Sequence, residues 1–403
     1  MAGKLSRQEP VGGVTSAVTG AVAAAESAAA ETLGSPDEAR SFNRRALFLG
    51  GAPKSGTTLL LSLLDGHPKL VVLPEETHFL EEYPRYASLG SFQAKLHRLL
   101  EKSDLRLLGQ GKGTPSREAP SANVRDYSGF DHDRFTRLTA HAAEQPWMND
   151  SLLFSETARA YAIAAGYNWR ECVRWVEKST SNECCPDTLF GLFPEAKLLQ
   201  VLRDPRAVFA SRKKRLLNRY GQHTKAHRLV REWNRSTRRI AQLLPRGDQY
   251  LVIRYEDFVR APREGLEKVC RFIGIECLPE LFSPTRGGRQ WQGNSSFSTG
   301  FSGISTDSVD QWKKELTEAE VWWIELHCRP GMQLAGYDLQ TDGRFSLSRW
   351  LRRLPGESRV GYLRARRASL CQFAGLLEHC RYDASAATVR IEPLLPHASS
   401  RAA

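Results

Sequence analysis

A glycine-rich loop lies between an apolar run and a leucine-rich segment early in the chain. Residues 46–49 read Ala-Leu-Phe-Leu, which predicts a short buried strand. Residues 51–58 follow with Gly-Ala-Pro-Lys-Ser-Gly-Thr-Thr, and residues 57–65 place leucines at helical spacing. A strand, a tight turn and a helix N-terminus direct backbone N–H groups at one point, which suits a bound phosphate. Residues 51–58 therefore predict a phosphate-binding loop.

Further short apolar runs alternate with helical segments along the chain. A helix is predicted to start at Pro205 with Asp204 as its cap, and another is predicted over residues 262–273. Ser155 is expected to cap a helix that runs through residues 160–165. This alternation predicts an α/β fold of three layers, α/β/α, around a central parallel sheet. The remaining strands are predicted at residues 70–73, 175–178, 197–202 and 250–253.

The composition divides the chain into four parts. Residues 1–43 are rich in Ala, Gly, Ser and Thr and predict a flexible leader. The main domain is expected to span residues 44–340. Within it, residues 81–150 carry Gly, Ser and Pro breaks and predict a helical insertion that forms a lid or binds an acceptor. Residues 341–403 predict a basic helical C-terminal extension and tail.

The net charge of +12 points to an anionic partner. Eight cysteines without a CxxC pair favour a reduced intracellular protein over a disulfide framework. The alanine-rich run at residues 14–30 is too weakly hydrophobic for a membrane span or a signal peptide. We therefore expect a cytoplasmic protein. The composition leaves the oligomeric state open.

The position of the loop lysine separates this loop from that of nucleoside triphosphatases. Those enzymes place lysine directly after the second glycine, whereas here Thr57 follows Gly56 and the lysine is Lys54. A lysine inside the loop can contact the bridging oxygen and the group being transferred, while the hydroxyls of Thr57 and Thr58 bind the phosphate. A nucleoside triphosphate kinase or hydrolase, with Asp204 as a magnesium ligand, stays an alternative.

Two signatures resemble the sulfotransferase family. The first joins residues 53–58 to Leu-Asp-Gly-His-Pro at 64–68 and Glu-Glu-Thr at 75–77, and the second is Leu-Arg-Asp-Pro-Arg-Ala-Val-Phe-Ala-Ser at 202–211. They lie about 150 residues apart and in the expected order. The chain is most similar to the branch that includes protein-tyrosine sulfotransferases and many bacterial enzymes. The resemblance covers roughly residues 46–337.

The resemblance implies the co-substrate 3′-phosphoadenosine-5′-phosphosulfate (PAPS) and the product adenosine 3′,5′-bisphosphate, with no metal required. Arg203 and Ser211 would hold the 3′-phosphate, and a loop at residues 293–297 would close over the nucleotide ahead of Lys313. The full set of expected PAPS contacts is Lys54, Ser55, Gly56, Thr57, Thr58, Arg203, Ser211, Tyr255, Ser295 and Ser296.

The catalytic groups are expected where the strands end, because ligands of open parallel sheets bind at the carboxyl ends of the strands. Lys54 and Lys178 are the cations that would neutralise the leaving phosphate. The resemblance makes Glu76 the general base, which would take the proton of the acceptor hydroxyl. His78 is its rival, and Glu75 would serve after a slip of one residue.

The acceptor is not specified by these motifs: a carbohydrate, a peptide tyrosine or a small metabolite would each supply a hydroxyl. Basic residues crowd residues 206–219 and 344–381. They form a solvated face, dock an anionic carbohydrate or acidic peptide, or contact an anionic membrane surface. No nucleic-acid-binding module is present in the sequence. A noncatalytic polyanion-binding protein is the remaining alternative.

Overall fold

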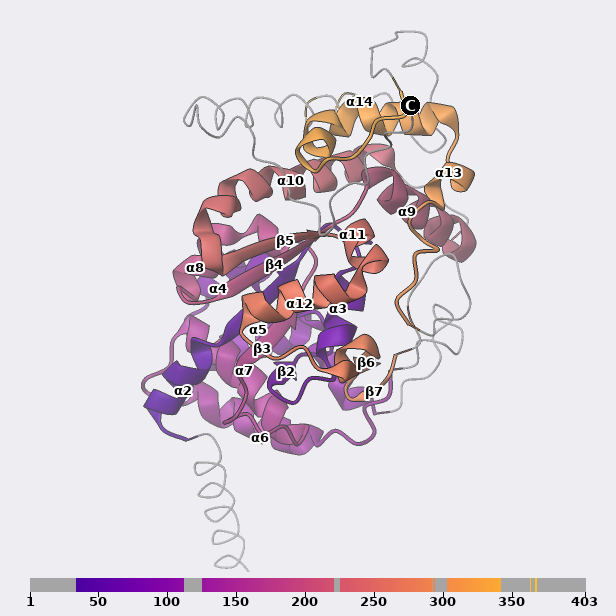
Figure 1. The fold of residues 1–403 in the computed structure, drawn as a ribbon. Coiled ribbons are helices and arrows are strands. Elements are labelled where there is room, and N and C mark those ends of the chain that lie inside the picture. Colours follow the sequence, from indigo (N-terminus) through magenta and orange to yellow (C-terminus); the bar gives the residue numbers. More distant parts are fainter. Residues whose placement is uncertain are drawn as a thin grey trace, which may run out of the picture.

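The core of the chain is a five-stranded parallel sheet with the strand order β2-β3-β1-β4-β5 (Figure 1). It is seen in a computed structural model that describes residues 34–111, 125–220, 225–291, 293, 303–341, 363 and 367. All five predicted strands are confirmed, and the fourth has the predicted bounds. They are β1 (Ala46–Gly50), β2 (Leu70–Val72), β3 (Arg174–Lys178), β4 (Lys197–Leu202) and β5 (Tyr250–Arg254).

Helices precede, connect and follow these strands. The α-helices are α2 (Pro36–Asn43), α3 (Thr57–Leu64), α4 (Phe79–Ala87), α5 (Phe92–Lys102), α6 (His132–Ala143), α7 (Asp150–Ala164), α8 (Pro186–Leu192), α9 (Pro205–Tyr220), α10 (Ala226–Leu243), α11 (Tyr255–Arg260), α12 (Pro262–Ile273), α13 (Trp312–Glu315) and α14 (Glu318–Leu334). Short 3-10 helices and a two-stranded hairpin complete the described part: η1 (Asp104–Gln110), η2 (Asn182–Cys184), η3 (Leu244–Gln249), η4 (Pro279–Phe282), β6 (Thr285–Arg286) and β7 (Arg289–Gln290).

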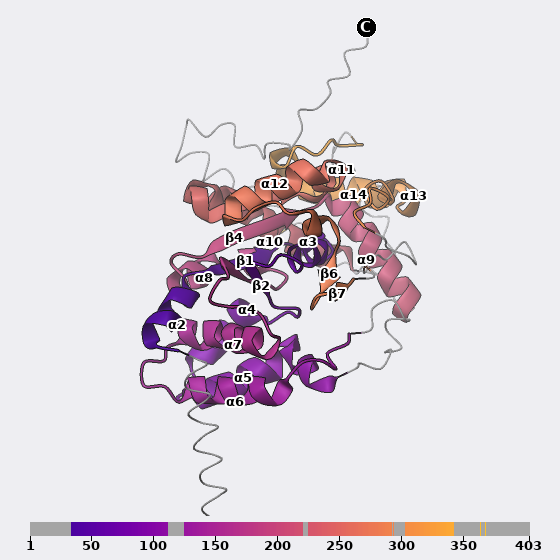
Figure 2. The ribbon, with the colours of Figure 1, turned by 60° about the horizontal axis from the view of Figure 1, so that its bottom comes forward.

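Both faces of the sheet are buried under helices, as the sequence predicted. Alternate residues of a strand point to opposite faces, and β1 shows the result. Phe48 packs at 5.3 Å from the ring of Phe193 and belongs to a hydrophobic core shared with α7 and α10. Leu47 and Leu49 belong to a second core shared with α3 and α12. Figure 2 shows α5, α6 and α7 on one side of the sheet and α12 on the other. The fold is therefore a three-layer α/β/α fold.

The end of the expected leader is folded. Residues 36–43 form α2, which begins with a capping box between Ser35 and Glu38. Phe42 in this helix is fully buried and stacks on Trp175 of β3 at 6.2 Å. The Trp175 indole N–H donates to the carbonyl of Phe42 at 2.9 Å. The boundary predicted at residue 43 was therefore wrong, since the ordered core begins at least as early as α2.

The helix that includes residues 160–164 also starts earlier than predicted. Asn149 caps α7, where its side-chain oxygen accepts the N–H of Leu152 at 2.9 Å. Ser155 lies inside the helix, is fully buried and donates to the carbonyl of Leu152. Within the predicted insertion, helices α4, α5, η1 and α6 pack on the core cluster that contains Phe48. No helix in the described ranges is long and apolar enough to cross a membrane.

Candidate active site

The glycine-rich loop is built from close contacts that exclude a side chain at two positions. Gly51 has φ 148°, and a Cβ there would lie 2.4 Å from the carbonyl oxygen of Val201 in β4. Gly56 has φ 99°, and a Cβ there would lie 2.4 Å from the ring of Tyr255. The loop is also tied to the segment after β3, because the buried carboxylate of Glu183 accepts the N–H of Gly51 at 2.7 Å. The sequence therefore needs both glycines to bring the loop against its neighbours.

The loop presents donors that fit a phosphate. Ser55 is fully buried, and its hydroxyl has no hydrogen-bond partner among the described residues. The N–H groups of the first turn of α3, which starts at Thr57, have no partners within the helix. Lys54 has a left-handed backbone with φ 76°, a strained conformation for a residue with a side chain. These groups suit the phosphate and leaving-group side of PAPS.

Arg203 joins the loop to the end of β4. Its guanidinium donates to the carbonyl of Lys54 at 3.1 Å and to the carbonyl of Ser308 at 2.8 Å. It also lies 4.4 Å from the ring centre of Tyr255, whose hydroxyl is 2.9 Å from that of Ser308. Arg203 Nε has no partner in the described part of the chain. Ser211, the residue expected to hold the 3′-phosphate together with Arg203, is buried in α9. Arg203 therefore contacts both Lys54 and Tyr255, and its Nε is a donor that could serve a ligand.

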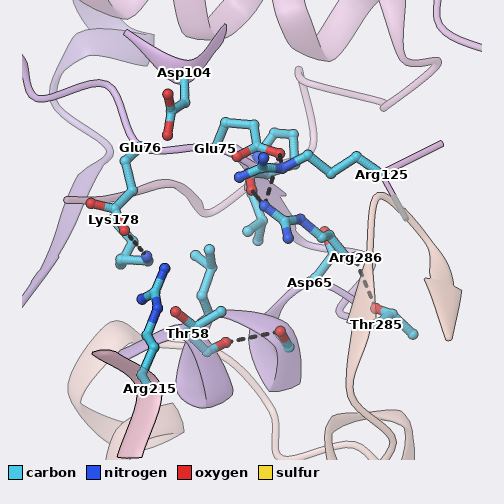
Figure 3. Close-up of a pocket in the computed structure, with 14 residues that line it drawn as sticks. Thr58, Asp65, Glu75, Glu76, Asp104, Arg125, Lys178, Arg215, Thr285 and Arg286 are labelled. Atoms are coloured by element: carbon cyan, nitrogen blue, oxygen red, sulfur yellow. Dashed lines mark hydrogen bonds and ion pairs between the residues drawn. The ribbon is translucent and has the colours of Figure 1, made fainter. Parts of the chain in front are cut away.

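A cavity of about 210 Å³ lies between α3 and the loop that follows β2 (Figure 3). It receives side chains from α3, from the ends of β2 and β3, from η1, from α9 and from the β6–β7 hairpin. Its lining residues are Thr58, Leu61, Ser62, Asp65, Val72, Pro74, Glu75, Glu76, Asp104, Arg125, Lys178, Arg215, Thr285 and Arg286. Thr58, Glu76 and Lys178 of the predicted site are among them.

Glu76 and Lys178 form an ion pair in this cavity. Lys178 Nζ lies 2.5 Å from Glu76 Oε1, while the other carboxylate oxygen accepts the N–H of Thr180 at 3.2 Å and its hydroxyl at 3.3 Å. Burial raises the pKa of Glu76, but the charge of Lys178 and the hydrogen bonds from Lys178 and Thr180 outweigh it, so the pKa lies below its ordinary value of 4.5. Glu76 is therefore ionised at neutral pH and able to accept a proton.

The two rival bases are placed differently. Glu75 is buried and its Oε1 lies 2.7 Å from Arg125 Nε and 2.8 Å from Arg286 Nη2. The same oxygen accepts the hydroxyl of Tyr127 at 2.5 Å. His78 does not line the cavity, and its Nε2 is 3.9 Å from Glu76 Oε2. Glu75 is thus paired with two guanidinium groups, whereas His78 lies next to Glu76 and outside the cavity lining.

Several lining residues were not predicted from the sequence. Arg125, Arg286 and Asp104 come from segments without a recognised motif, and Arg215 was noted only as part of a basic helix. Figure 3 shows Arg215 extending from α9 into the cavity. Asp65 stood in a quoted motif, and it accepts the hydroxyl of Thr285 at 2.7 Å. That motif and the Glu-Glu-Thr motif that contains Glu75 were the sequence signals that pointed to this side of the cavity.

Four basic residues of helix α9 are paired with acids within the fold. Arg212 pairs with Glu232 at 2.5 Å, and two lysines pair with acids of α14 and α13. Arg206 is buried between Asp204 and Glu325, at 2.6 Å from each. These residues are therefore paired within the fold, and the three alternatives given for the basic segment stay open. Asp204, which the kinase alternative would use as a metal ligand, is held by Arg206 through both carboxylate oxygens.

The remaining expected contacts are not in the cavity or not described. Lys313 is half exposed in α13 and pairs with Asp310 at 2.9 Å. Ser295 and Ser296, in the loop expected to cover the nucleotide, lie outside the described residues, as does nearly all of the basic extension at 341–403.

Comparison with known proteins identifies related sequences. Residues 46–280, more than half of the chain, match the Sulfotransferase family. Carbohydrate sulfotransferase 3 of Homo sapiens is 27% identical over 173 residues, which cover 37% of this chain and 35% of that protein. Protein-tyrosine sulfotransferase of Drosophila melanogaster is 25% identical over 240 residues, which cover 58% of this chain and 39% of that protein. The matched part thus spans well under half the length of these relatives. Among solved structures, the sulfotransferase domain from the curacin biosynthetic pathway has a TM-score of 0.41 and 20% identity, covering 73% of this chain and 98% of that one.

Proposed function

The chain belongs to the sulfotransferase family, and we propose that it transfers the sulfuryl group of PAPS to an acceptor hydroxyl. One observation carries this proposal: a carboxylate, a lysine and the phosphate-binding helix border the same cavity, through Glu76, Lys178 and Thr58. Among the described residues, the buried hydroxyl of Ser55 and the Nε of Arg203 have no hydrogen-bond partner, which supports a polar ligand near the loop and near the end of β4.

The proposed reaction is an in-line displacement at sulfur. Glu76 takes the proton of the acceptor hydroxyl, the acceptor oxygen forms a bond to sulfur, and the bond from sulfur to the phosphate oxygen breaks. The electron pair of that bond stays on the phosphate, where Lys54 and Lys178 balance the added negative charge. Glu76 leaves the step protonated, and adenosine 3′,5′-bisphosphate is the second product.

For the acceptor, we propose a carbohydrate that carries an anionic group. Arg125 and Arg286 both lie within 2.8 Å of a single carboxylate, that of Glu75, so two guanidinium groups share one acid at this wall, while Asp65 and Asp104 line the same cavity. Arg215 adds a further cation. The relatives include both carbohydrate sulfotransferases and protein-tyrosine sulfotransferases, so the choice between these acceptors rests on the cavity and on the assay below.

A transfer assay with labelled PAPS tests the proposal. The full chain is incubated with an oligosaccharide that contains uronic acid, the same oligosaccharide with its carboxylates reduced to alcohols, and an acidic tyrosine peptide. We expect transfer to the first and a strong loss for the second. Preference for the peptide would overturn the acceptor proposal only. Calorimetry with adenosine 3′,5′-bisphosphate and with Mg-ATP tests the class itself, since magnesium-dependent ATP binding without bisphosphate binding contradicts it.

A further inference from the structure

Glu177 is a buried carboxylate that lies next to Lys178 but outside the cavity. It is 1% exposed in β3, and four hydrogen bonds from three residues end on it. A buried charge is costly unless its hydrogen-bonding capacity is filled, and here both carboxylate oxygens accept. The residues that donate these hydrogen bonds follow two different strands, β2 and β3. Glu177 therefore connects the segments that follow these strands.

One oxygen of Glu177 holds the loop that carries the proposed base. Its Oε1 accepts the hydroxyl of Thr77 at 2.7 Å, the N–H of Thr77 at 3.3 Å and the hydroxyl of Ser179 at 2.5 Å. The Ser179 oxygen in turn accepts the N–H groups of Thr77 at 3.1 Å and His78 at 2.8 Å. Thr77 directly follows Glu76, so these bonds fix the backbone from which Glu76 extends.

The other oxygen reaches toward the phosphate-binding loop. Its Oε2 accepts the side-chain N–H of Asn182 at 2.7 Å, and the same nitrogen donates to the carbonyl of Leu49 in β1 at 2.9 Å. Leu49 is two residues before Gly51, whose carbonyl accepts the N–H of Ser181 at 3.3 Å. A single carboxylate therefore connects the base loop, the strand that ends in Lys178 and the strand that leads into the phosphate loop.

We propose that Glu177 is a positioning residue that sets the Glu76–Lys178 pair in register with the phosphate-binding loop, an inference that rests on the proposed function. The Thr77 N–H donates to Glu177 and to Ser179 Oγ, and the His78 N–H donates to Ser179 Oγ. Because Glu177 accepts the Ser179 hydroxyl, an acceptor at this point keeps the Ser179 oxygen turned toward both N–H groups. The loop after β2 also contains the strained backbone of His78, with φ 53°, which needs such support to persist.

Glu177→Gln tests this role because it keeps the shape and replaces one acceptor with a donor. If the new amide faces Asn182, two donors meet, and Asn182 cannot turn because its nitrogen also serves Leu49. If the amide faces the other way, it meets the N–H of Thr77. We expect kcat to fall roughly 10-fold or more, with little change in the KM for PAPS, because the reacting groups are misplaced rather than the nucleotide contacts.

A second readout does not require activity. Weakening the Glu76–Lys178 contact leaves the burial that raises the pKa of Glu76 and reduces the effect that lowers it, so the pKa should rise. It is measured by carbon NMR of the carboxyl group, with the signal assigned by its loss in Glu76→Gln. Thr77→Val, a milder change that removes one donor, should shift the pKa in the same direction.

Leu266→Ala is the matched control for loss of stability. Leu266 is fully buried in α12 and does not line the cavity, so this variant should lower the melting temperature and leave kcat and the Glu76 pKa unchanged. If Glu177→Gln and Thr77→Val behave like Leu266→Ala, the positioning role is wrong. If the wild type shows no transfer from PAPS, the proposed function fails, while the pKa comparison still decides the role of Glu177.

Discussion

Lys178 Nζ lies 2.5 Å from Glu76 Oε1, and this contact joins the ends of two neighbouring strands across the proposed reaction site. Glu76 follows β2 and Lys178 ends β3, so the parallel pairing of the two strands brings a base and a cation to one edge of the sheet. The same contact sets the protonation of the base. Burial alone would keep Glu76 protonated to higher pH, whereas Lys178 reverses the direction.

Lys178→Met should move the acid limb of the pH profile of kcat/KM to higher pH. Burial still raises the pKa of Glu76 in this variant, and the positive charge that lowers it is gone, so a higher pH is needed to ionise the base. The maximal rate also falls, because Lys178 is a proposed cation for the leaving phosphate. Lys69→Met, at an exposed pair with Glu171 at 2.8 Å, is the control and should change neither. An acid limb that stays in place in Lys178→Met contradicts the coupling.

Glu76→Gln should reduce kcat by about 10²- to 10⁴-fold, the usual contribution of a general base. Binding of adenosine 3′,5′-bisphosphate should remain, since no nucleotide contact is assigned to this side chain. His78→Gln is the comparison, because His78 Nε2 is 3.9 Å from Glu76 Oε2 and does not line the cavity. We expect its kcat to stay within a few-fold of the wild type. The reverse pattern, with activity retained in Glu76→Gln and lost in His78→Gln, would make His78 the base.

Gly56→Ala should abolish bisphosphate binding and destabilise the protein by about 1–3 kcal/mol. The backbone there has φ 99°, and the added carbon would lie 2.4 Å from the Tyr255 ring. Gly191→Ala is a matched control inside α8, where an added carbon meets nothing within 4 Å. It should be neutral or stabilise by up to about 1 kcal/mol, because alanine favours a helix over glycine. Urea unfolding and calorimetry measure both effects, and normal binding by Gly56→Ala would refute the proposed loop contacts.

Arg286→Gln should weaken binding of the acceptor rather than binding of the nucleotide. The variant removes one of two guanidinium groups beside Glu75, so kcat/KM for an anionic oligosaccharide should fall by about 10-fold or more while that for its neutral analogue changes less. Arg289→Gln lies in the same hairpin, is half exposed and does not line the cavity, so it is the control. Equal losses for the charged and the neutral acceptor would show that Arg286 does not read acceptor charge.

The sequence predicted the parts of this fold that depend on residues close together in the chain. β4 and α12 have the predicted bounds, and the glycine loop and Arg203 meet because both follow strands of one sheet. It missed contacts between segments far apart in sequence, such as Glu75 with Arg286, 211 residues away. It also missed α2, although Ser35 and Glu38 carry a capping signal, because the alanine-rich residues before them dominated the composition. The roles assigned to the site residues stay predictions.

The charge pattern of α9 illustrates the same limit and supplies a stability test. Its sequence shows clustered cations but not their partners. The structure distinguishes the buried cluster of Arg206, Asp204 and Glu325 from the partly exposed pair of Arg212 and Glu232. Arg206→Met would leave two buried carboxylates, Asp204 and Glu325, without their shared cation, and should cost about 3–5 kcal/mol of the free energy of unfolding.

Arg212→Met is the matched change in the same helix. Arg212 and Glu232 are 22% and 30% exposed, so water screens this pair and its loss should cost less than about 1 kcal/mol. Urea unfolding at neutral pH compares the two variants directly. Ser211 lies in α9 between these arginines. If Arg206→Met lowers the free energy of unfolding strongly but leaves the affinity for the bisphosphate unchanged without denaturant, the stability of the helix and its proposed phosphate contact are independent. Equal losses of stability in the two variants would mean that burial does not determine how much these ion pairs contribute to the free energy of unfolding.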